Sequence, residues 1–434
     1  MNPTKNTTEQ TPPPAYFGSL TITDVKCFKG EQTIDLSDGN GKPAMWTVIL
    51  GNNNTGKTTL LRCLAELEPK LYDVNFVGDN SEIFVPKRHG KYKKPEKWWM
   101  LKDAFIKKTY RVSASVLFKT SSEFSWKSEK NWWYETEGTS GVRSNEISNL
   151  IIYGYGTSRK MGNSSLIDTE NQDNTASLFD DNATVINAEE WLVQTDYASK
   201  NGIESAKFRL EKIKNILING LLPDAKDFKC TSTETNGKIN NFVEIETDYG
   251  WVKLRELGYG YQVTLAWVVD LAQKMFVRYK DSKNPLHEPA IVLVDEIDLH
   301  LHPEWQRKII SFLREQFPRT QFIVTTHSPL IVQSAEDINL VLLKKEDNHV
   351  VIEQPKLKTY RGWTVEEILS ELMGLDDKTL SDDYLKFMQQ FEDALDEDDY
   401  KEAKNAYDKL DKILHPTSHQ RKLLRIQMSS LMPE

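Results

Sequence analysis

Gly51-Asn52-Asn53-Asn54-Thr55-Gly56-Lys57-Thr58 is the stretch that decides the fold. It follows the apolar, β-branched run Trp46 to Leu50 and leads into Thr59 to Ala65, which has the composition of a helix. Strand, glycine turn and helix predict a phosphate-binding loop, because the N–H groups of the turn and of the helix start then point at anionic oxygens. Lys57 would reach the β- and γ-phosphates of a nucleotide, and Thr58 would offer its hydroxyl to Mg²⁺. The expected nucleotide-binding residues are Gly51, Asn52, Asn53, Asn54, Thr55, Gly56, Lys57, Thr58 and Thr59.

Two further apolar runs end in polar side chains far downstream. Ala290 to Val294 leads into Asp295 and Glu296, and Gln321 to Thr326 leads into His327. Continuous apolar runs are typical of buried parallel strands, and doubly wound sheets bind ligands where such strands end. We therefore expect Asp295 to hold Mg²⁺ through its water shell and Glu296 to polarise the attacking water. The alternative is a set of solvated acids and a hydrogen-bonded histidine at separate strand ends.

These motifs resemble those of ABC-type ATPases of the SMC/RecF branch. Asp295-Glu296 matches the Walker B motif with its catalytic glutamate, Asp298 to Pro303 matches the D-loop of that branch, and His327 matches its switch histidine. The resemblance covers residues 18–65 and 250–345. It implies an α/β fold, in which an ABC-type P-loop ATPase head, built on a mixed sheet flanked by helices and carrying insertions, precedes an α-helical C-terminal region. It also implies hydrolysis of ATP to ADP and phosphate with Mg²⁺, and the catalytic residues it implies are Glu296, His327 and Lys57.

Leu257-Gly258-Tyr259-Gly260-Tyr261-Gln262 occupies the place of the ABC signature, ahead of the apolar helix predicted from Val263 to Met275. The family usually has L-S-x-G-x-Q there, and its subunits pair head to tail so that each signature caps the γ-phosphate on the other subunit. Gly258 replaces the usual serine, which removes a hydroxyl contact but leaves the backbone N–H groups and the helix dipole. The alternative is an ordinary glycine turn before a core helix. The residues implied to act in trans are Gly258, Tyr259, Gly260, Gln262 and Asp298.

A looser resemblance extends to compact bacterial ATPases of the AAA family, among them the ATPase subunit of the Septu anti-phage system. Tyr153 to Arg159, Ser177 to Phe179 and Ala188 to Leu192 carry it. That resemblance implies a separate HNH-type nuclease partner, and the sequence after residue 345 offers neither the acidic motifs of a Toprim nuclease nor an H-N-H cluster. The Q-loop glutamine of the family is not evident. Arg159, which follows a predicted strand, is the candidate for that neighbourhood.

The composition is that of an ordinary soluble protein. Of 434 residues, 39% are hydrophobic and 27% charged, and no apolar run reaches the length of a membrane helix, so we expect no membrane contact. Met1 to Ala15 lacks the apolar core of a signal peptide and reads as a disordered tail. Cys27, Cys63 and Cys230 are widely spaced, as expected of thiols in a reducing cytoplasm.

One basic stretch, Lys87 to Trp99, interleaves six Lys or Arg residues with aromatic ones. Basic groups neutralise phosphates and aromatic faces stack on bases, so the stretch is a candidate contact with DNA or RNA. A solvated loop whose tryptophans dock on the core, or an aromatic stacked on the adenine of ATP, explains it equally. The net charge of −9 argues against a protein coated with nucleic acid. The candidate residues are Arg88, Lys91, Lys93, Lys94 and Lys97.

The chain is expected to hold a disordered tail (1–16), an ABC-type ATPase domain (17–355, with insertions at about 66–250) and a helical domain (356–434) for oligomer or partner contacts. Polar Met161 to Asn187 reads as an exposed loop. In the helical domain, Glu392 to Glu402 carries seven Asp or Glu and one Lys. It is either a solvated helix junction or a docking face for a basic partner.

Three functions remain open. The first, which we favour, is an ATP-gated subunit of a defence complex that controls a separate nuclease. The second is a stand-alone ATPase that acts on DNA in repair. The third is a nucleotide-bound scaffold with little turnover.

Overall fold

The computed structural model describes residues 14–71, 84–86, 111–119, 126–135, 150–162, 173–222, 225–375 and 381–431. It divides into an N-terminal unit (Met1–Gly362) and a C-terminal unit (Trp363–Glu434). The basic stretch Lys87 to Trp99 lies outside the described residues, as does the expected tail up to residue 13. Arg88, Lys91, Lys93, Lys94 and Lys97 therefore have no structural account.

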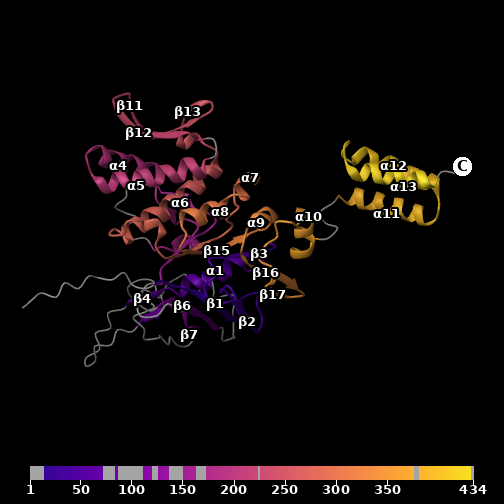
Figure 1. The fold of residues 1–434 in the computed structure, drawn as a ribbon, viewed down its shortest axis with the longest axis horizontal. Coiled ribbons are helices and arrows are strands. Elements are labelled where there is room, and N and C mark those ends of the chain that lie inside the picture. The colour runs from indigo at the N-terminus through magenta and orange to yellow at the C-terminus, as the bar shows by residue number, and fades with distance from the viewer. Residues whose placement is uncertain are drawn as a thin grey trace, which may run out of the picture. The chain divides into compact units, whose positions relative to one another are not determined.

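A six-stranded mixed sheet is the centre of the N-terminal unit (Figure 1). In pairing order its strands are β17 (His349–Glu353), β16 (Asn339–Glu346), β3 (Trp46–Gly51), β15 (Thr320–Thr326), β14 (Ala290–Val294) and β8 (Ile152–Tyr155). Only β17 is antiparallel to its neighbour; the other neighbouring pairs are parallel. Every residue of β3, β14 and β15 is buried, which requires the continuous apolar runs seen in the sequence. The three predicted strands are confirmed.

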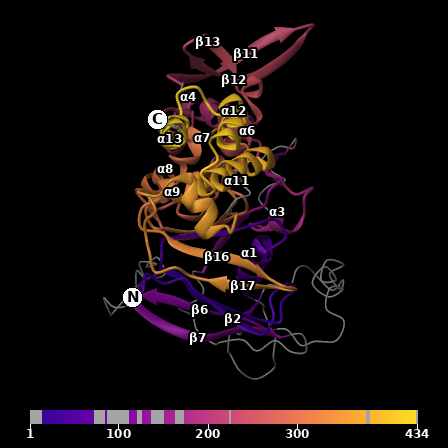
Figure 2. The same ribbon diagram turned by 90° about the vertical axis from the view of Figure 1, so that its right-hand side faces the viewer.

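A second, antiparallel sheet pairs β2 (Glu31–Asp35), β1 (Ala15–Thr23), β6 (Arg111–Lys119) and β7 (Trp126–Glu135) in that order (Figure 2). Helix α1 (Lys57–Glu66) shares one buried apolar cluster with both sheets. Phe17 and Leu20 of β1, Leu60 and Leu64 of α1, and Ile323 of β15 all belong to that cluster. Each such side chain contributes about 1.5–3 kcal/mol on burial, so this cluster fixes the helix that follows the glycine loop.

Helices and a small sheet make up the rest of the N-terminal unit. Two helices lie between residues 188 and 216, separated at Gly202, whose φ is +84°. A three-stranded antiparallel sheet follows them, ahead of the signature segment. These elements are α4 (Ala188–Lys200), α5 (Glu204–Ile216), the π-helix η3 (Leu217–Leu221), β11 (Asp227–Thr235), β12 (Lys238–Thr247), β13 (Gly250–Lys253), the 3-10 helix η4 (Leu254–Glu256) and α6 (Tyr259–Arg278).

Shorter elements connect these layers. They are β4 (Pro69–Leu71), β5 (Phe84–Pro86), β9 (Lys160–Met161), α3 (Ala176–Phe179), β10 (Thr184–Val185), the 3-10 helix η5 (Pro285–His287), α7 (Pro303–Gln306), α8 (Ile309–Gln316) and α9 (Pro329–Ser334).

The prediction of an exposed loop from Met161 to Asn187 is wrong for its described part, 173–187. Ser177 and Leu178 are buried, and the Ser177 hydroxyl donates to the Gly154 carbonyl of β8. A Cβ on Gly154 would come within 2.5 Å of Leu178 Cδ1, so the segment packs directly on that strand. Composition suggested a loop because its short polar side chains favour turns, whereas here they bond to strand backbone.

The C-terminal unit is helical, as the sequence predicts. Its described helices are α10 (Val365–Glu367) with the π-helix η6 (Ile368–Leu372), α11 (Asp382–Asp396), α12 (Tyr400–Ile413) and α13 (His419–Ser430). Phe391, Leu410 and Leu424 lie in the core shared by α11, α12 and α13. Within the acidic stretch, Asp399 caps α12 by accepting the N–H groups of Lys401 and Glu402.

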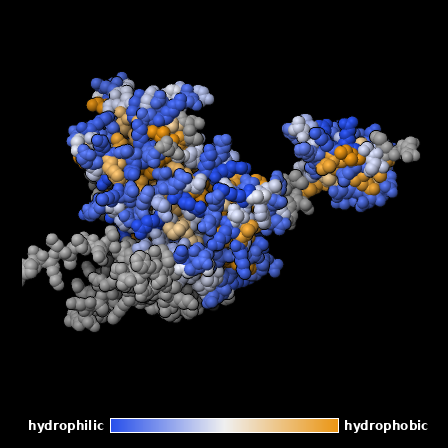
Figure 3. Space-filling model, viewed as in Figure 1, coloured by the Kyte–Doolittle hydropathy of each residue, from blue (hydrophilic) through white to orange (hydrophobic). Residues whose placement is uncertain are grey.

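None of the helices described in either unit combines the length and apolar character needed to cross a bilayer. On the face shown in Figure 3, hydrophilic residues cover most of the described surface.

Candidate nucleotide site

The parallel strands bring their polar ends to one edge of the central sheet. The glycine loop follows β3, Asp295 and Glu296 follow β14, and His327 follows β15. Leu50 of β3 pairs with Thr326 of β15, and Val294 of β14 pairs with Val324, so the three strands end at nearly the same level. The structure therefore brings the three polar clusters together at one edge of the sheet.

The glycine loop has the backbone that phosphate binding needs. Gly56, the N-cap of α1, has a φ of +88°, and a Cβ there would lie 2.7 Å from Cys27 Sγ and 2.8 Å from the Phe28 ring. Only glycine fits both requirements. Lys57 Nζ donates to the carbonyls of Gly51 at 2.9 Å and Asn52 at 3.0 Å. Burial lowers the pKa of Lys57, and the nearby carboxylates of Asp295, Glu296 and Asp298 oppose that shift.

Thr58 and Asp295 meet at the start of α1. Thr58 Oγ1 donates to Asp295 Oδ2 at 2.6 Å, and Thr325 Oγ1 donates to Asp295 Oδ1 at 2.6 Å. A hydroxyl and a carboxylate in contact beside a phosphate-binding loop supply the hard oxygen donors that Mg²⁺ prefers. Thr58 and Asp295 are therefore the described residues that fit a metal bound with the nucleotide.

Glu296 and His327 lie beside this pair. His327 Nε2 is 3.8 Å from Glu296 Oε1, and both side chains remain about one third exposed, at 29% and 32%. Glu296 has a φ of +48°, and its N–H donates to Thr325 Oγ1 at 2.7 Å. Burial lowers the pKa of His327, as does the Lys57 ammonium, while Glu296 acts in the opposite sense. The imidazole is therefore neutral at pH 7.

Arg159 is the site residue whose role the sequence did not reveal. Its side chain is 1% exposed, Nε donates to the Gly156 carbonyl at 2.7 Å, and Nη2 donates to the main-chain carbonyls of Asp295 and Glu296. Of the two glutamines between the glycine loop and the signature, Gln194 bonds to Glu190 on α4, and Gln172 lies outside the described residues. The signal in the sequence that could have drawn attention to Arg159 is the pair of glycines before it, Gly154 and Gly156.

The signature segment begins α6 and touches the D-loop of the same chain. Gly258 is the N-cap of α6 and is exposed, and a Cβ on Gly260 would lie 2.1 Å from the His300 carbonyl oxygen. The Tyr259 ring stands edge-on to the His300 ring at 5.1 Å. Gln262 Nε2 donates to the Leu257 carbonyl at 2.7 Å.

Asp298 ties the D-loop to the central sheet. Its Oδ1 accepts the Thr326 hydroxyl at 2.6 Å, immediately before His327. His302, at the other end of the D-loop, caps α7 by accepting the Glu304 N–H. Within one chain, Asp298 therefore lies beside the nucleotide site, next to His327.

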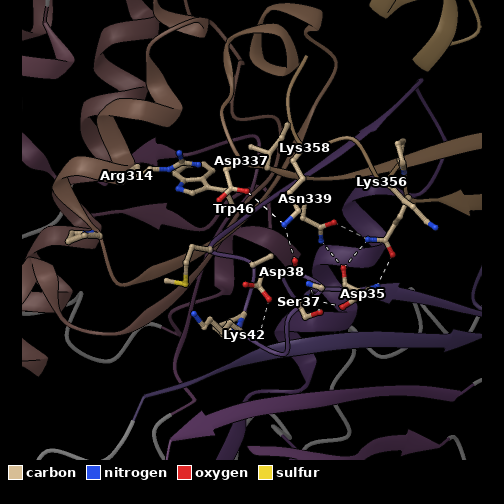
Figure 4. Close-up of a pocket in the computed structure, with 18 residues that line it drawn as sticks. Asp35, Ser37, Asp38, Lys42, Trp46, Arg314, Asp337, Asn339, Lys356 and Lys358 are labelled. Carbon is tan, nitrogen blue, oxygen red and sulfur yellow. Dashed lines mark hydrogen bonds and ion pairs between the residues drawn. The ribbon is translucent and has the colours of Figure 1, made fainter. Parts of the chain in front are cut away.

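A cavity of about 620 Å³ lies at the opposite edge of the sheet (Figure 4). Trp46 and Asn339 line it from the first residues of β3 and β16. Asn339 Nδ2 donates to the Asp35 carbonyl at 2.7 Å, and Gln354 Nε2 donates to the same oxygen at 2.9 Å. The cavity is thus separate from the glycine loop, and these polar side chains already bond to one another.

Comparison with known proteins gives three kinds of match. The family model described as "AAA domain, putative AbiEii toxin, Type IV TA system" matches residues 46–333. Septu protein PtuA of Bacillus thuringiensis is 37% identical over 216 residues, 48% of this chain and 53% of that protein. Septu protein PtuA of Bacillus mycoides (strain KBAB4) is 26% identical over 394 residues, 87% of this chain and 48% of that protein. The chain thus spans about half the length of these curated relatives.

Two further matches are another relative and a solved structure. The retron Ec83 probable ATPase of Escherichia coli is 37% identical over 145 residues, 33% of this chain and 26% of that protein. Among solved structures, the Smc head bound to the C-winged helix domain of ScpA has a TM-score of 0.40 at 14% identity, over 79% of this chain and 98% of that one. The resemblance to an AAA-family ATPase and to the Septu ATPase, expected from the motifs, is confirmed by the family and its relatives. Because the family model covers more than half of the sequence, this chain belongs to that AAA-domain family.

Proposed function

We propose that this chain is the ATP-binding and ATP-hydrolysing subunit of a bacterial anti-phage defence complex. The observation that carries the enzymatic part is the meeting of Lys57, Thr58, Asp295, Glu296 and His327 at one edge of the parallel sheet. The similarity to Septu protein PtuA supports the defence role. The three free thiols of the chain agree with a cytoplasmic location.

The residues of the site divide the work of phosphoryl transfer. Lys57 exchanges its bonds with the loop carbonyls for the β- and γ-phosphate oxygens, to which the N–H groups at the start of α1 also point. Thr58 and Asp295 would hold Mg²⁺, which neutralises phosphate charge. Glu296 polarises the attacking water, and neutral His327, 3.8 Å away, orients water and γ-phosphate.

The second half of the site comes from another copy of the chain, in a head-to-tail pair. Gly258, Tyr259, Gly260 and Gln262 lie at the start of the 20-residue helix α6, whose dipole favours an anion at that end. Gly258 and Tyr259 are exposed, as a surface that meets a nucleotide on a partner must be. Asp298 connects the same face to the strand that carries His327.

A separate HNH-type nuclease is the proposed partner that this ATPase gates. The proposed ATPase domain is 17–355, and the proposed contact domain is 356–434. In the latter, Ile413, Leu423 and Ile426 are large apolar side chains that are about half or more exposed, at 49%, 59% and 65%. The basic residues Arg88, Lys91, Lys93, Lys94 and Lys97 are proposed contacts for DNA or RNA.

Hydrolysis by the purified chain tests the enzymatic part. We expect Glu296→Gln to lower kcat for MgATP by about 10²–10⁴-fold, the range that one general base contributes, while ATP stays bound and pairs of chains accumulate. Lys57→Ala should instead lose ATP binding, because the ammonium is the only described cation that bonds to the loop carbonyls. Glu304→Gln, an exposed carboxylate at the start of α7, is the matched control and should hydrolyse normally. Normal turnover by Glu296→Gln would remove Glu296 from the mechanism.

Native mass spectrometry of the chain co-expressed with its genomic neighbour tests the complex. A stable assembly of several copies with a smaller nuclease, and loss of phage resistance with Glu296→Gln in cells, is the expected result. A lone monomer or dimer whose ATPase is stimulated by linear DNA would favour a stand-alone repair enzyme. Retained nucleotide without phosphate release would favour a scaffold.

A further inference from the structure

Arg159 bonds to the main chain of two neighbouring residues of the site, Asp295 and Glu296. Its Nη2 donates to the carbonyl oxygens of Asp295 and Glu296, the latter at 2.7 Å, while its Nε donates to Gly156 at 2.7 Å. The side chain is 1% exposed, so it is closed off from solvent. Burial lowers the pKa of Arg159 to about 10, and the carboxylates of Asp295, Asp298 and Glu296 oppose that shift, so the guanidinium stays charged at pH 7.

The contacts hold a strained peptide. Glu296 has a φ of +48°, a left-handed conformation that costs a non-glycine residue about 1–2 kcal/mol. Each flank of this residue is fixed: its N–H by Thr325 Oγ1, its carbonyl by Arg159, and the preceding N–H of Asp295 by the Tyr155 carbonyl at 2.8 Å. Without the guanidinium, the two carbonyls would lose their common donor, and the peptide could rotate toward an ordinary φ.

The strand β8, which ends four residues before Arg159, is itself well anchored. A Cβ on Gly156 would lie 2.0 Å from the Ser177 carbonyl oxygen, so the backbone there cannot shift outward. The Tyr155 hydroxyl donates to Asp270 of α6 at 2.8 Å, which fixes the other side of the strand. Arg159 therefore transmits the position of a rigid strand end to Asp295 and Glu296.

We propose that Arg159 is a positioning residue for ATP hydrolysis, which aims the Glu296 carboxylate by holding the Asp295 and Glu296 carbonyls. The inference rests on the proposed ATPase function and assigns a part of it that no motif contains. The guanidinium bonds to main chain, so its effect falls on the placement of Glu296 and leaves nucleotide affinity to the glycine loop. A lysine could reach only one of the carbonyls with the same directionality, because it lacks the planar fork.

Steady-state hydrolysis and nucleotide affinity, measured on the full chain, test the inference. We expect Arg159→Met to lower kcat by about 100-fold, the loss that follows a displacement of roughly 1 Å at a reacting group. The Kd for a non-hydrolysable ATP analogue, measured without Mg²⁺ so that Asp295 does not contribute through the metal, should stay within about threefold, because Lys57 and the loop are untouched. Arg159→Lys should fall between Arg159→Met and the unsubstituted chain.

Two matched controls separate positioning from general stability. Tyr155→Phe removes a buried hydrogen bond from the same strand but leaves its carbonyl on Asp295, and it should melt at a lower temperature with kcat nearly unchanged. Arg314→Ala removes another guanidinium that donates to a main-chain carbonyl, that of Glu336, at the opposite edge of the sheet, and it should hydrolyse normally.

Chemical rescue covers the case in which Arg159→Met folds poorly. Arg159→Ala leaves a space shaped for guanidinium, so millimolar guanidinium should raise its kcat, whereas methylammonium should not. Arg159→Met turnover within threefold of the unsubstituted chain, or equal losses in kcat and in analogue affinity, overturns the inference. If that happens while Glu296→Gln is inactive, the proposed ATPase function still stands. Absence of hydrolysis by the unsubstituted chain overturns both.

Discussion

The carboxyl edge of the central sheet and the start of α6 are built in opposite ways. At the sheet edge, charged side chains are satisfied within one chain: Lys57 bonds to its own loop, and Asp295 accepts two hydroxyl groups. At the start of α6, Gly258 caps the helix without a side-chain hydrogen bond, and Tyr259 is 57% exposed.

This difference follows from how the two regions are made. Parallel strands deliver side chains from distant parts of the sequence to one edge, so that edge can organise its charges alone. A helix start has unpaired N–H groups, and glycine provides no side chain to pair with them. The contrast teaches that the side chains of the sheet edge pair within one copy, whereas the start of α6 stays exposed.

The largest effect is expected where the signature touches its own chain. Gly260→Ala would place a methyl group 2.1 Å from the His300 carbonyl oxygen, which forces the backbone of α6 or of the D-loop to shift. We expect the free energy of unfolding to fall by about 1–3 kcal/mol, as for other overpacked sites, and ATP-driven pairing to weaken at least tenfold. Thermal melting and sedimentation in ATP, both in the Glu296→Gln background, measure the two effects.

Gly258→Ala is the matched control for that experiment. A Cβ on Gly258 meets only Tyr261 Cδ2, at 3.7 Å, which is ordinary contact. It should leave stability and pairing nearly unchanged. Equal effects of the two alanines on pairing would show that the Gly260 contact with the D-loop does not organise the signature.

A smaller gain is expected from restoring the family's usual serine. Gly258→Ser would add one hydroxyl at the exposed end of α6, where there is room for it. One added hydrogen bond contributes about 1 kcal/mol, so ATP-dependent pairing should tighten by roughly fivefold for each of the two signatures in a pair. The dimer dissociation constant in ATP is the measurement. Tighter pairing in the absence of ATP as well would mean that the hydroxyl bonds to protein and that the signature does not face a phosphate.

Sequence patterns predicted the residues at the sheet edge but missed the role of Arg159, which bonds to their main chain. The glycine loop and the apolar runs before Asp295 and His327 could be recognised because phosphate binding and burial constrain residue type directly. Arg159 could not, because a buried arginine whose partners are main-chain oxygens leaves no pattern in those partners. The glycines Gly154 and Gly156 could be seen in the sequence. They are required because Leu178 and Ser177 pack against them, and those residues lie in a segment whose composition suggested a loop.

The same contrast explains the helices. The expected helical C-terminal region is formed by α11, α12 and α13 around a core of their own, which amphipathic spacing can indicate because that core is local. The strand β11 was missed although its pairing with β12 is also local: Thr235 pairs with Lys238 across the turn Asn236-Gly237, where both residues have positive φ.

The smallest effect concerns the protonation of His327 at the sheet edge. Burial and Lys57 lower the pKa of His327 below 6.5, so the folded chain binds this proton less tightly than the unfolded chain does. The contribution to stability is therefore constant above pH 6.5 and decreases as the pH falls through 6.5 toward the lower folded pKa. If neutral His327 orients the γ-phosphate, kcat should be constant from pH 8 to 6.5 and decrease at lower pH. The variant His327→Gln should not show this decrease. A pH profile of kcat for both proteins decides this: a descending limb that persists unchanged in His327→Gln would assign the titration to another group.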